Sequence, residues 1–436
     1  MGRRKGRFIC WVLIWLLLLP AFPAGAEEEL QLASQAAVLM DADTGVVLYE
    51  KNMHASLAPA SITKVMTALL AMENLEPEQV LTVSQTAVNA VPRTSSHISL
   101  LAGERLTVDQ ALYAIGMESA NDAANVLAEA VGGSLENFAR MMTEKARSLG
   151  AVNTSFTNAN GLPDSGHRTT AYDMALITAA ALKQEGLANY FSTVTYTLSA
   201  TNLSQARSFH NKDRLLPGGQ YYYEGVLLAK TGWTSSAQGT FVAAVKQGNT
   251  TLIAVTLKSP LLEDKYKDTH KLLDYGFTHY SAVTVSGEQV TARLSLGEYT
   301  PVKGQKFSYL LPTGTLFTDI QYCLAEEVDF EEAKSLRLTV PVTASIEGNA
   351  LPEISVTLEK PAPPRQAYIL AELLNAGGAD PEQVQAILSA LRIPSLVLGV
   401  LLLIFMVLLF RRQLQRHRRR KHLKARIRRM KKRMEP

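Results

Sequence analysis

The pattern of apolar and polar positions after residue 30 first predicts a β-hairpin. Residues 36–41 (AAVLMD) and 46–50 (VVLYE) are strand-like, and the turn-forming residues 42–45 separate them. The pattern then changes at residue 61, because the apolar residues of SITKVMTALLAME stand three and four positions apart. That spacing predicts a helix over residues 61–73.

Two further helices are expected in the next stretch. Thr107 and Gln110 have the spacing of a capping box, so a helix should begin there, and it should end near Glu118. Another helical period runs from Ala123 to Ala130 and stops at a pair of glycines.

The central part of the chain returns to a strand pattern. Apolar runs at 225–229, 241–245 and 251–257 predict three strands, and residues 264–275 predict a helix that closes the unit. Strands and helices therefore mix within residues 27–282, which we expect to form an α/β domain.

A second, smaller domain is expected after residue 282. Strand-like alternation occupies residues 283–296, 336–346 and 353–359 without a long helix, which predicts a small all-β domain over 283–360. A Pro-rich linker and a helical stalk should follow over 361–392. Cys323 falls in this domain, where we expect it to be buried.

The N-terminus has the order of a secretory signal peptide. Four basic residues precede the apolar run 8–19, and the small residues Ala24, Gly25 and Ala26 follow it. We expect residues 1–26 to be a signal peptide cleaved after Ala26; the alternative is an uncleaved membrane anchor.

The C-terminal region predicts a transmembrane helix. Residues 393–410 carry no charge over 18 positions, a length of roughly 27 Å at about 1.5 Å per residue, which matches a bilayer core. Fourteen Lys and Arg crowd the tail 411–436, and such residues stay on the cytoplasmic side. We expect a single-pass membrane protein with its tail in the cytoplasm and residues 27–392 outside it. The alternative is a buried core helix followed by a nucleic-acid-binding tail.

The charge of the body argues against nucleic-acid binding there. The whole chain of 436 residues has a formal net charge of +4, but its basic residues gather at the two ends. Residues 27–410 contain 26 Lys and Arg against 39 Asp and Glu, a net charge of −13. A body of that sign repels a phosphate backbone.

Three short motifs carry candidate chemistry. The first is Ser61–Ile62–Thr63–Lys64, where the three-residue spacing puts the lysine amine on the helix face of the serine hydroxyl. The second is Ser119–Ala120–Asn121, between two predicted helices. The third is Lys230–Thr231–Gly232, followed by Trp233 and Thr234, at the end of an apolar strand. Together they offer a nucleophile, a base, a proton relay and a clamp for an anion. This ordered set is a signature of penicillin-binding proteins and class A β-lactamases.

With these motifs and their neighbours, the chain resembles the low-molecular-weight penicillin-binding proteins that are D-alanyl-D-alanine carboxypeptidases of the serine DD-peptidase family. The resemblance covers roughly residues 30–365 and includes Pro59–Ala60, Asn121–Asp122–Ala123, Asn160–Gly161–Leu162–Pro163, His167, Thr169–Thr170–Ala171 and Asp173. It implies a catalytic domain with an antiparallel sheet and a helical lobe. It also implies a peptidoglycan stem pentapeptide as substrate, β-lactams as covalent inhibitors, and neither metal nor organic cofactor.

The resemblance also implies a role for each motif residue. Ser61 would form the acyl-enzyme and release the terminal D-alanine, with Lys64 as general base and Ser119 as proton relay. The substrate-binding residues would be Asn121, Lys230, Thr231, Gly232, Trp233 and Thr234. The backbone N–H groups of Ser61 and Trp233 would form the oxyanion hole.

Two positions depart from the pattern of relatives. Trp233 stands where relatives often carry His or Tyr, and Lys265 stands where some carry Arg, whose bidentate fork lysine lacks. For His167 we expect a structural hydrogen bond rather than a catalytic role, because Lys64 already supplies a base.

Two other functions remain alternatives. A β-lactamase would need a glutamate that places a hydrolytic water, but no E-x-x-L-N sequence occurs between Asn121 and Lys230. A catalytically inactive wall-binding protein would not need the complete set of motif residues.

Overall fold

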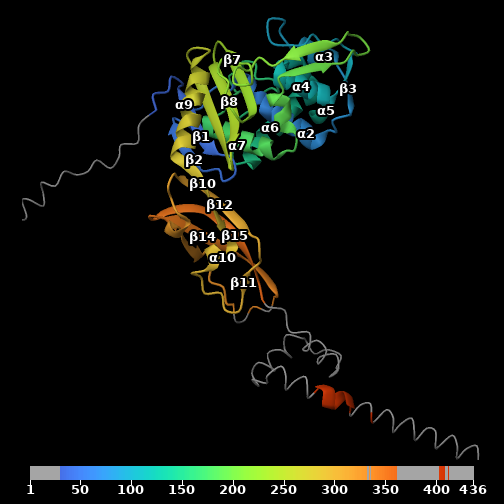
Figure 1. Ribbon diagram of the computed structural model, residues 1–436. Helices are drawn as coiled ribbons and strands as arrows, with labels where there is room; N and C mark the ends of the chain where they lie inside the picture. The colour runs from blue at the N-terminus through green and yellow to red at the C-terminus, as the bar shows by residue number, and fades with distance from the viewer. Residues whose placement is uncertain (1–29, 331–332, 334, 361–401, 408–410, 412–436) are drawn as a thin grey trace, which may run out of the picture. The chain divides into compact units, whose positions relative to one another are not determined.

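The computed structural model describes residues 30–330, 333, 335–360, 402–407 and 411 (Figure 1). These residues divide into two compact units. The first unit extends to Val285 and also takes in Phe307–Gln321 and Ser345–Pro352; the second holds Ser286–Lys306, Tyr322–Ala344 and the described residues from Glu353 onward. Each unit is described here by itself.

A five-stranded antiparallel sheet is the centre of the first unit. Its strand order is β2-β1-β9-β8-β7. The predicted hairpin and the three predicted central strands are confirmed. The strands are β1 (Ala36–Asp41), β2 (Val47–Lys51), β7 (Val226–Thr234), β8 (Gln238–Gln247) and β9 (Thr250–Ser259).

Both faces of this sheet are buried. Alternate residues of β1 point to opposite faces, so Val38 and Met40 join one hydrophobic cluster while Ala37 and Leu39 join another. Helix α9 (Asp264–His279) belongs to the second cluster, and α7 (Ala171–Lys183) belongs to the first. Burial on both faces explains why the sequences of these strands are continuous apolar runs.

A helical lobe lies beside the sheet (Figure 1). The capping box predicted at Thr107 and Gln110 is present and starts α4. Helix α5 ends at Gly132 and is capped by Gly133, whose φ of +71° favours glycine. The lobe's helices are α2 (Lys64–Asn74), α3 (Gln85–Asn89), α4 (Val108–Met117), α5 (Asn121–Gly132), α6 (Leu135–Ser148) and α8 (Leu187–Ser192).

Short elements complete the first unit. Three pairs of strands lie outside the main sheet: β3 (Val80–Thr82) with β4 (Arg105–Thr107), β5 (Thr195–Leu198) with β6 (Arg207–His210), and β10 (Tyr280–Ser286) with β12 (Lys306–Pro312). Two 3₁₀ turns are η1 (Ala60–Thr63) and η2 (Phe317–Asp319).

The second unit is built on a four-stranded sheet of order β11-β15-β14-β13, formed by β11 (Thr300–Pro301), β13 (Gln321–Leu324), β14 (Arg337–Ile346) and β15 (Asn349–Glu359). The strand expected throughout 283–296 is wrong beyond Ser286. There a capping box formed by Ser286 and Gln289 starts the short helix α10 (Gly287–Thr291). The expected burial of Cys323 is also wrong. This residue is exposed, because it lies with Gln321 on the solvent-facing side of β13.

The predicted signal peptide (1–26), the predicted linker and stalk (361–392) and most of the predicted span (393–410) lie outside the described residues. Within the described part of the chain, no helix has both the length and the apolar character needed to cross a membrane.

Candidate active site

The candidate nucleophile stands on a tight turn. Ser61 lies in η1 and not in the regular helix predicted for it; α2 begins three residues later, at Lys64. Ala60 has a φ of +50°, a strained conformation for a residue with a side chain. Gly161 packs under this turn, and a Cβ there would lie 2.0 Å from the Ala60 carbonyl oxygen. The turn that presents Ser61 therefore depends on a glycine far along the chain.

The amine of Lys64 is enclosed by acceptors. Its Nζ lies 3.1 Å from Ser61 Oγ, 2.7 Å from Asn121 Oδ1 and 2.6 Å from the carbonyl oxygen of Asn160. The whole residue is inaccessible to solvent. The pair expected from the S-x-x-K spacing is therefore in hydrogen-bond contact.

Burial holds the pKa of Lys64 well below its ordinary value of 10.5, and the positive charge of Lys230 lowers it further, against the opposing effect of Asp122. A neutral amine has two N–H groups and one lone pair. The two N–H groups can donate to Asn121 and Asn160, and the lone pair then faces the hydroxyl of Ser61. This arrangement suits a base that removes the serine proton.

Ser119 occupies the break between α4 and α5. Its φ is +58°, again a strained value for a residue with a side chain. Its Oγ is buried and has no hydrogen-bond partner among the described residues. A buried hydroxyl without a partner is costly, so its retention beside the cleft is a feature expected of a functional group.

The third motif forms the end of β7. Lys230 is nearly fully buried, and its Nζ donates to the Thr231 carbonyl oxygen at 3.1 Å. Lys265, from α9, donates to Thr231 Oγ1 and, at 3.4 Å, to the Gly232 carbonyl oxygen. Thr234 is placed differently from the prediction: its Oγ1 accepts from the Ala237 N–H within the β7–β8 turn, and it is not among the cleft-lining residues.

Gly232 brings the strand close to the nucleophile. A Cβ at this position would lie 2.3 Å from Thr240 Oγ1 and 2.9 Å from the backbone nitrogen of Ser61. Only a glycine lets the two backbones approach so closely. The backbone N–H of Ser61 therefore lies directly beside the end of β7.

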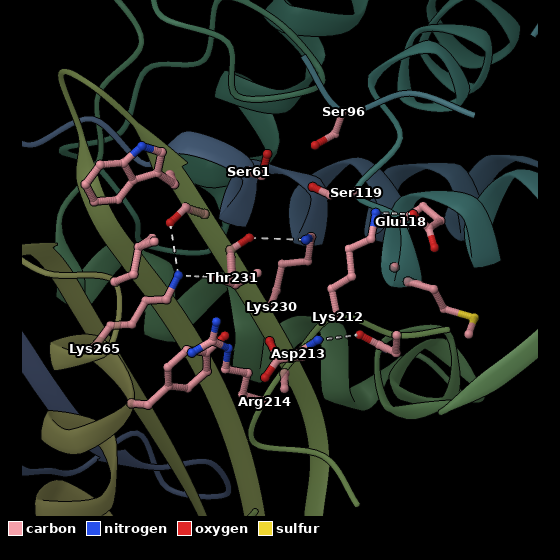
Figure 2. A pocket seen from close by; sticks show the side chains of 18 residues that line it. Ser61, Ser96, Glu118, Ser119, Lys212, Asp213, Arg214, Lys230, Thr231 and Lys265 are labelled. Atoms are coloured by element: carbon pink, nitrogen blue, oxygen red, sulfur yellow. Dashed lines mark hydrogen bonds and ion pairs between the residues drawn. The ribbon is translucent and has the colours of Figure 1, made fainter. Parts of the chain in front are cut away.

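A cleft of about 360 Å³ joins these motifs (Figure 2). Of the predicted site residues, Ser61, Ser119, Lys230, Thr231, Gly232 and Trp233 line it, while Lys64 and Asn121 lie behind Ser61 and contact each other. Trp233 is 47% exposed at the rim. Lining residues that the sequence did not single out include Ser96, Glu118, Lys212, Asp213 and Arg214.

His167 has the structural role expected for it. Thr63 Oγ1 donates to the Ala60 carbonyl oxygen, so it accepts from His167 Nε2 at 2.8 Å. The Thr157 N–H donates to His167 Nδ1 at 3.0 Å. These two bonds fix the neutral tautomer with its proton on Nε2 and brace the turn that holds Ser61.

Acid should weaken the fold through His167. Burial lowers its pKa from 6.5 to about 4, and a proton on Nδ1 would face the Thr157 N–H. The stability that comes from this neutral ring is complete above pH 6.5 and is lost as pH falls toward 4, because only the unfolded chain takes up the proton. Urea unfolding at pH 7 and pH 5 should show His167 contributing a loss of about 2 kcal/mol.

The variant His167→Gln provides the comparison, since its amide can make both bonds without titrating. The wild-type protein should lose about 2 kcal/mol more than this variant between the two pH values. Equal losses in both proteins would show that His167 does not titrate in this way.

Comparisons with known proteins identify the family of this chain. The family profile described as D-alanyl-D-alanine carboxypeptidase (peptidase S11) matches residues 23–260, more than half of the sequence. The chain belongs to this family. It is a serine-type hydrolase with the penicillin-binding DD-carboxypeptidase function of that class.

Individual relatives agree with this carboxypeptidase assignment. D-alanyl-D-alanine carboxypeptidase DacF of Bacillus subtilis is 36% identical over 283 residues, which cover 63% of this chain and 72% of the relative. DacC of Escherichia coli is 30% identical over 319 residues, covering 69% of this chain and 78% of that one.

Solved structures share the fold of this carboxypeptidase. A mutant of the Streptomyces K15 DD-transpeptidase is 27% identical, with a TM-score of 0.53, over 57% of this chain and 99% of that one. Penicillin-binding protein 6B from Escherichia coli, at 23% identity, has a TM-score of 0.60 over 76% of this chain and 97% of that one. The mixed α/β DD-peptidase fold expected from the sequence is confirmed.

Proposed function

We propose that this protein removes the terminal D-alanine of peptidoglycan stem pentapeptides through an acyl-enzyme on Ser61. The observation that carries the proposal is the contact between Lys64 Nζ and Ser61 Oγ, 3.1 Å long, at the cleft. In the first step Lys64 takes the hydroxyl proton, Ser61 Oγ bonds to the carbonyl carbon of the penultimate D-alanine, and a tetrahedral oxyanion forms. The backbone N–H groups of Ser61 and Trp233 stabilise this oxyanion.

Collapse of the tetrahedral species breaks the C–N bond of the terminal D-alanine. The leaving amine needs a proton, and Ser119 passes it from Lys64, since this residue lines the same cleft and its Oγ has no hydrogen-bond partner among the described residues. Water then adds to the ester and gives up a proton to Lys64. The products are the tetrapeptide carboxylate and free Ser61.

The end of β7 binds the substrate's terminal carboxylate. Lys230 and Lys265 supply two buried cations and Thr231 supplies a hydroxyl, all of them lining the cleft. Charge-assisted hydrogen bonds of this type are shorter and stronger than neutral ones. Asn121 accepts from Lys64 through Oδ1, which leaves its Nδ2 to donate to the substrate peptide. β-Lactams, which also carry a carboxylate beside an acylating carbonyl, enter the same cleft and acylate Ser61.

The test uses the full chain purified in detergent and an N-acylated peptide ending in D-Ala-D-Ala. We expect release of free D-alanine and, with benzylpenicillin, a covalent adduct that persists on Ser61. The two carboxylates among the lining residues are Glu118, which pairs with Lys212, and Asp213, so no free glutamate activates water there. Rapid penicillin turnover without an adduct would favour the β-lactamase alternative. Absence of both activities would favour the inactive wall-binding alternative.

We also propose that the protein is exported and anchored by residues 393–410, with the basic tail in the cytoplasm. The support is the sequence of the two ends alone: the basic, apolar and small order of residues 1–26, and the uncharged run before fourteen basic residues. A chain truncated after residue 392 should leave the membrane fraction. Its retention there would contradict the anchor.

A further inference from the structure

Asp213 is a buried carboxylate in the cleft whose orientation is fixed by its own loop. The Asp213 N–H donates to Asn211 Oδ1 at 3.0 Å, and Asp213 Oδ1 accepts from the Leu215 N–H at 3.0 Å. The residue is 6% exposed, and its Oδ2 has no hydrogen-bond partner among the described residues. One carboxylate oxygen is thus anchored, and the other is left for electrostatic interactions.

Two buried cations of the terminal carboxylate subsite interact electrostatically with this group. Lys230 on β7 and Lys265 on α9 are 2% and 3% exposed, and both line the same cleft as Asp213 (Figure 2). The other ionisable lining side chains are those of Arg214, Tyr266 and the ion pair formed by Lys212 and Glu118. Around Asp213 the cleft therefore holds two buried lysines and one buried carboxylate.

Asp213 and the two lysines each favour the charged form of the other. Burial raises the pKa of Asp213 to about 6, while the Leu215 N–H and the two lysines oppose that rise. Burial lowers the pKa of Lys230 and of Lys265 to about 8, and Asp213 keeps both from falling further. Near pH 7, between these values, the charged form of each group prevails, so the trio has a net charge of about +1.

We propose that Asp213 is a specificity-determining residue: it keeps Lys230 and Lys265 charged, and it restricts the subsite to a peptide end with a single carboxylate. This inference rests on the proposed function, because it takes the trio as the place where the terminal carboxylate binds. A monocarboxylate neutralises the net charge of the trio. A C-terminal residue with a second carboxylate, such as D-aspartate, leaves a buried excess negative charge, which is costly.

The test measures binding without turnover. Ser61→Ala, with and without Asp213→Asn, is titrated with three N-acylated peptides, which end in D-Ala-D-Ala, in its C-terminal amide, or in D-Ala-D-Asp. At pH 6.5 the added Asp213→Asn change should tighten binding of the acid peptide about tenfold, tighten the D-aspartate peptide more, and leave the amide peptide unchanged.

The pH dependence gives a second signature. With Asp213 present, the acid peptide should bind more tightly as pH falls through 6, because protonation removes the competing charge. In Asp213→Asn this step should vanish. The loss of binding at high pH should also begin at a lower pH, because without Asp213 the pKa values of Lys230 and Lys265 fall. Equal effects on acid and amide peptides, or a step that persists in the variant, would overturn the proposal.

Two further variants keep the result interpretable. Asp213→Asn retains an acceptor for the Leu215 N–H, and if it fails to fold, Asp213→Ser offers a hydroxyl at the same place. Glu118→Gln is the matched control, because it removes a lining carboxylate whose charge Lys212 compensates. It should keep the step near pH 6, and losing the step there would contradict the assignment to Asp213. The proposed function is tested separately, by measuring D-alanine release with protein that retains Ser61.

Discussion

Replacing Ser61 by alanine should lower D-alanine release by about 10⁴-fold or more, since the variant lacks the hydroxyl that lies beside the Lys64 amine and forms the acyl bond. The fold should survive. Ser61 is only half-buried, and its Oγ contacts are Lys64 at 3.1 Å and the Asn160 carbonyl oxygen at 3.5 Å. Release of D-alanine from an N-acylated D-Ala-D-Ala peptide and the mass of a penicillin adduct are the two measurements.

The matched control for this change is Ser96→Ala, which removes an exposed hydroxyl that lines the same cleft. It should keep release within about tenfold of wild type and should still form the adduct. If Ser61→Ala unfolded at the wild-type temperature and yet released D-alanine normally, Ser61 would not be the nucleophile.

Replacing Lys64 by methionine should lower the rate of acylation by about 10³- to 10⁴-fold. Methionine fills a similar volume but leaves Asn121 Oδ1 and the Asn160 carbonyl oxygen without this donor, which costs about 1–3 kcal/mol per group. The urea midpoint should therefore fall, and the acylation rate of the variant that remains folded should still be lower by the stated factor. Stopped-flow acylation by a chromogenic β-lactam measures that rate.

The variant Lys64→Arg separates a base from a mere cation. A guanidinium stays charged at every working pH, so it can hold an anion but cannot accept the proton of Ser61. It should be as slow as Lys64→Met. Acylation within tenfold of wild type in Lys64→Arg would mean that Lys64 contributes charge rather than basicity.

Local spacing made much of the catalytic unit predictable. The three-residue separation of Ser61 and Lys64 was sufficient for their contact, although Ser61 lies in a 3₁₀ turn. The apolar runs predicted three strands of the central sheet because both faces of that sheet are buried. The capping box at Thr107 and Gln110 predicted the start of α4.

Long-range contacts were out of reach of such patterns. Asn160 contributes its backbone carbonyl to Lys64 across 96 positions, and a carbonyl leaves no mark in the side-chain sequence. Asp213 is a single acidic residue in a loop, and its importance comes from lysines on two other elements.

Helix α10 was predictable, since Ser286 and Gln289 have the same capping-box spacing as the pair that starts α4.

The most direct measurement of the central claim is the charge of the Lys64 amine. In protein labelled with ¹³C and ¹⁵N at lysine, the signal lost in Lys64→Met identifies Lys64, and its shift can be followed with pH. We expect a titration midpoint well below 10.5, with the acylation rate falling as pH drops through that same midpoint. A Lys64 amine that stays protonated up to about pH 10.5 while the enzyme acylates rapidly at neutral pH would contradict the account.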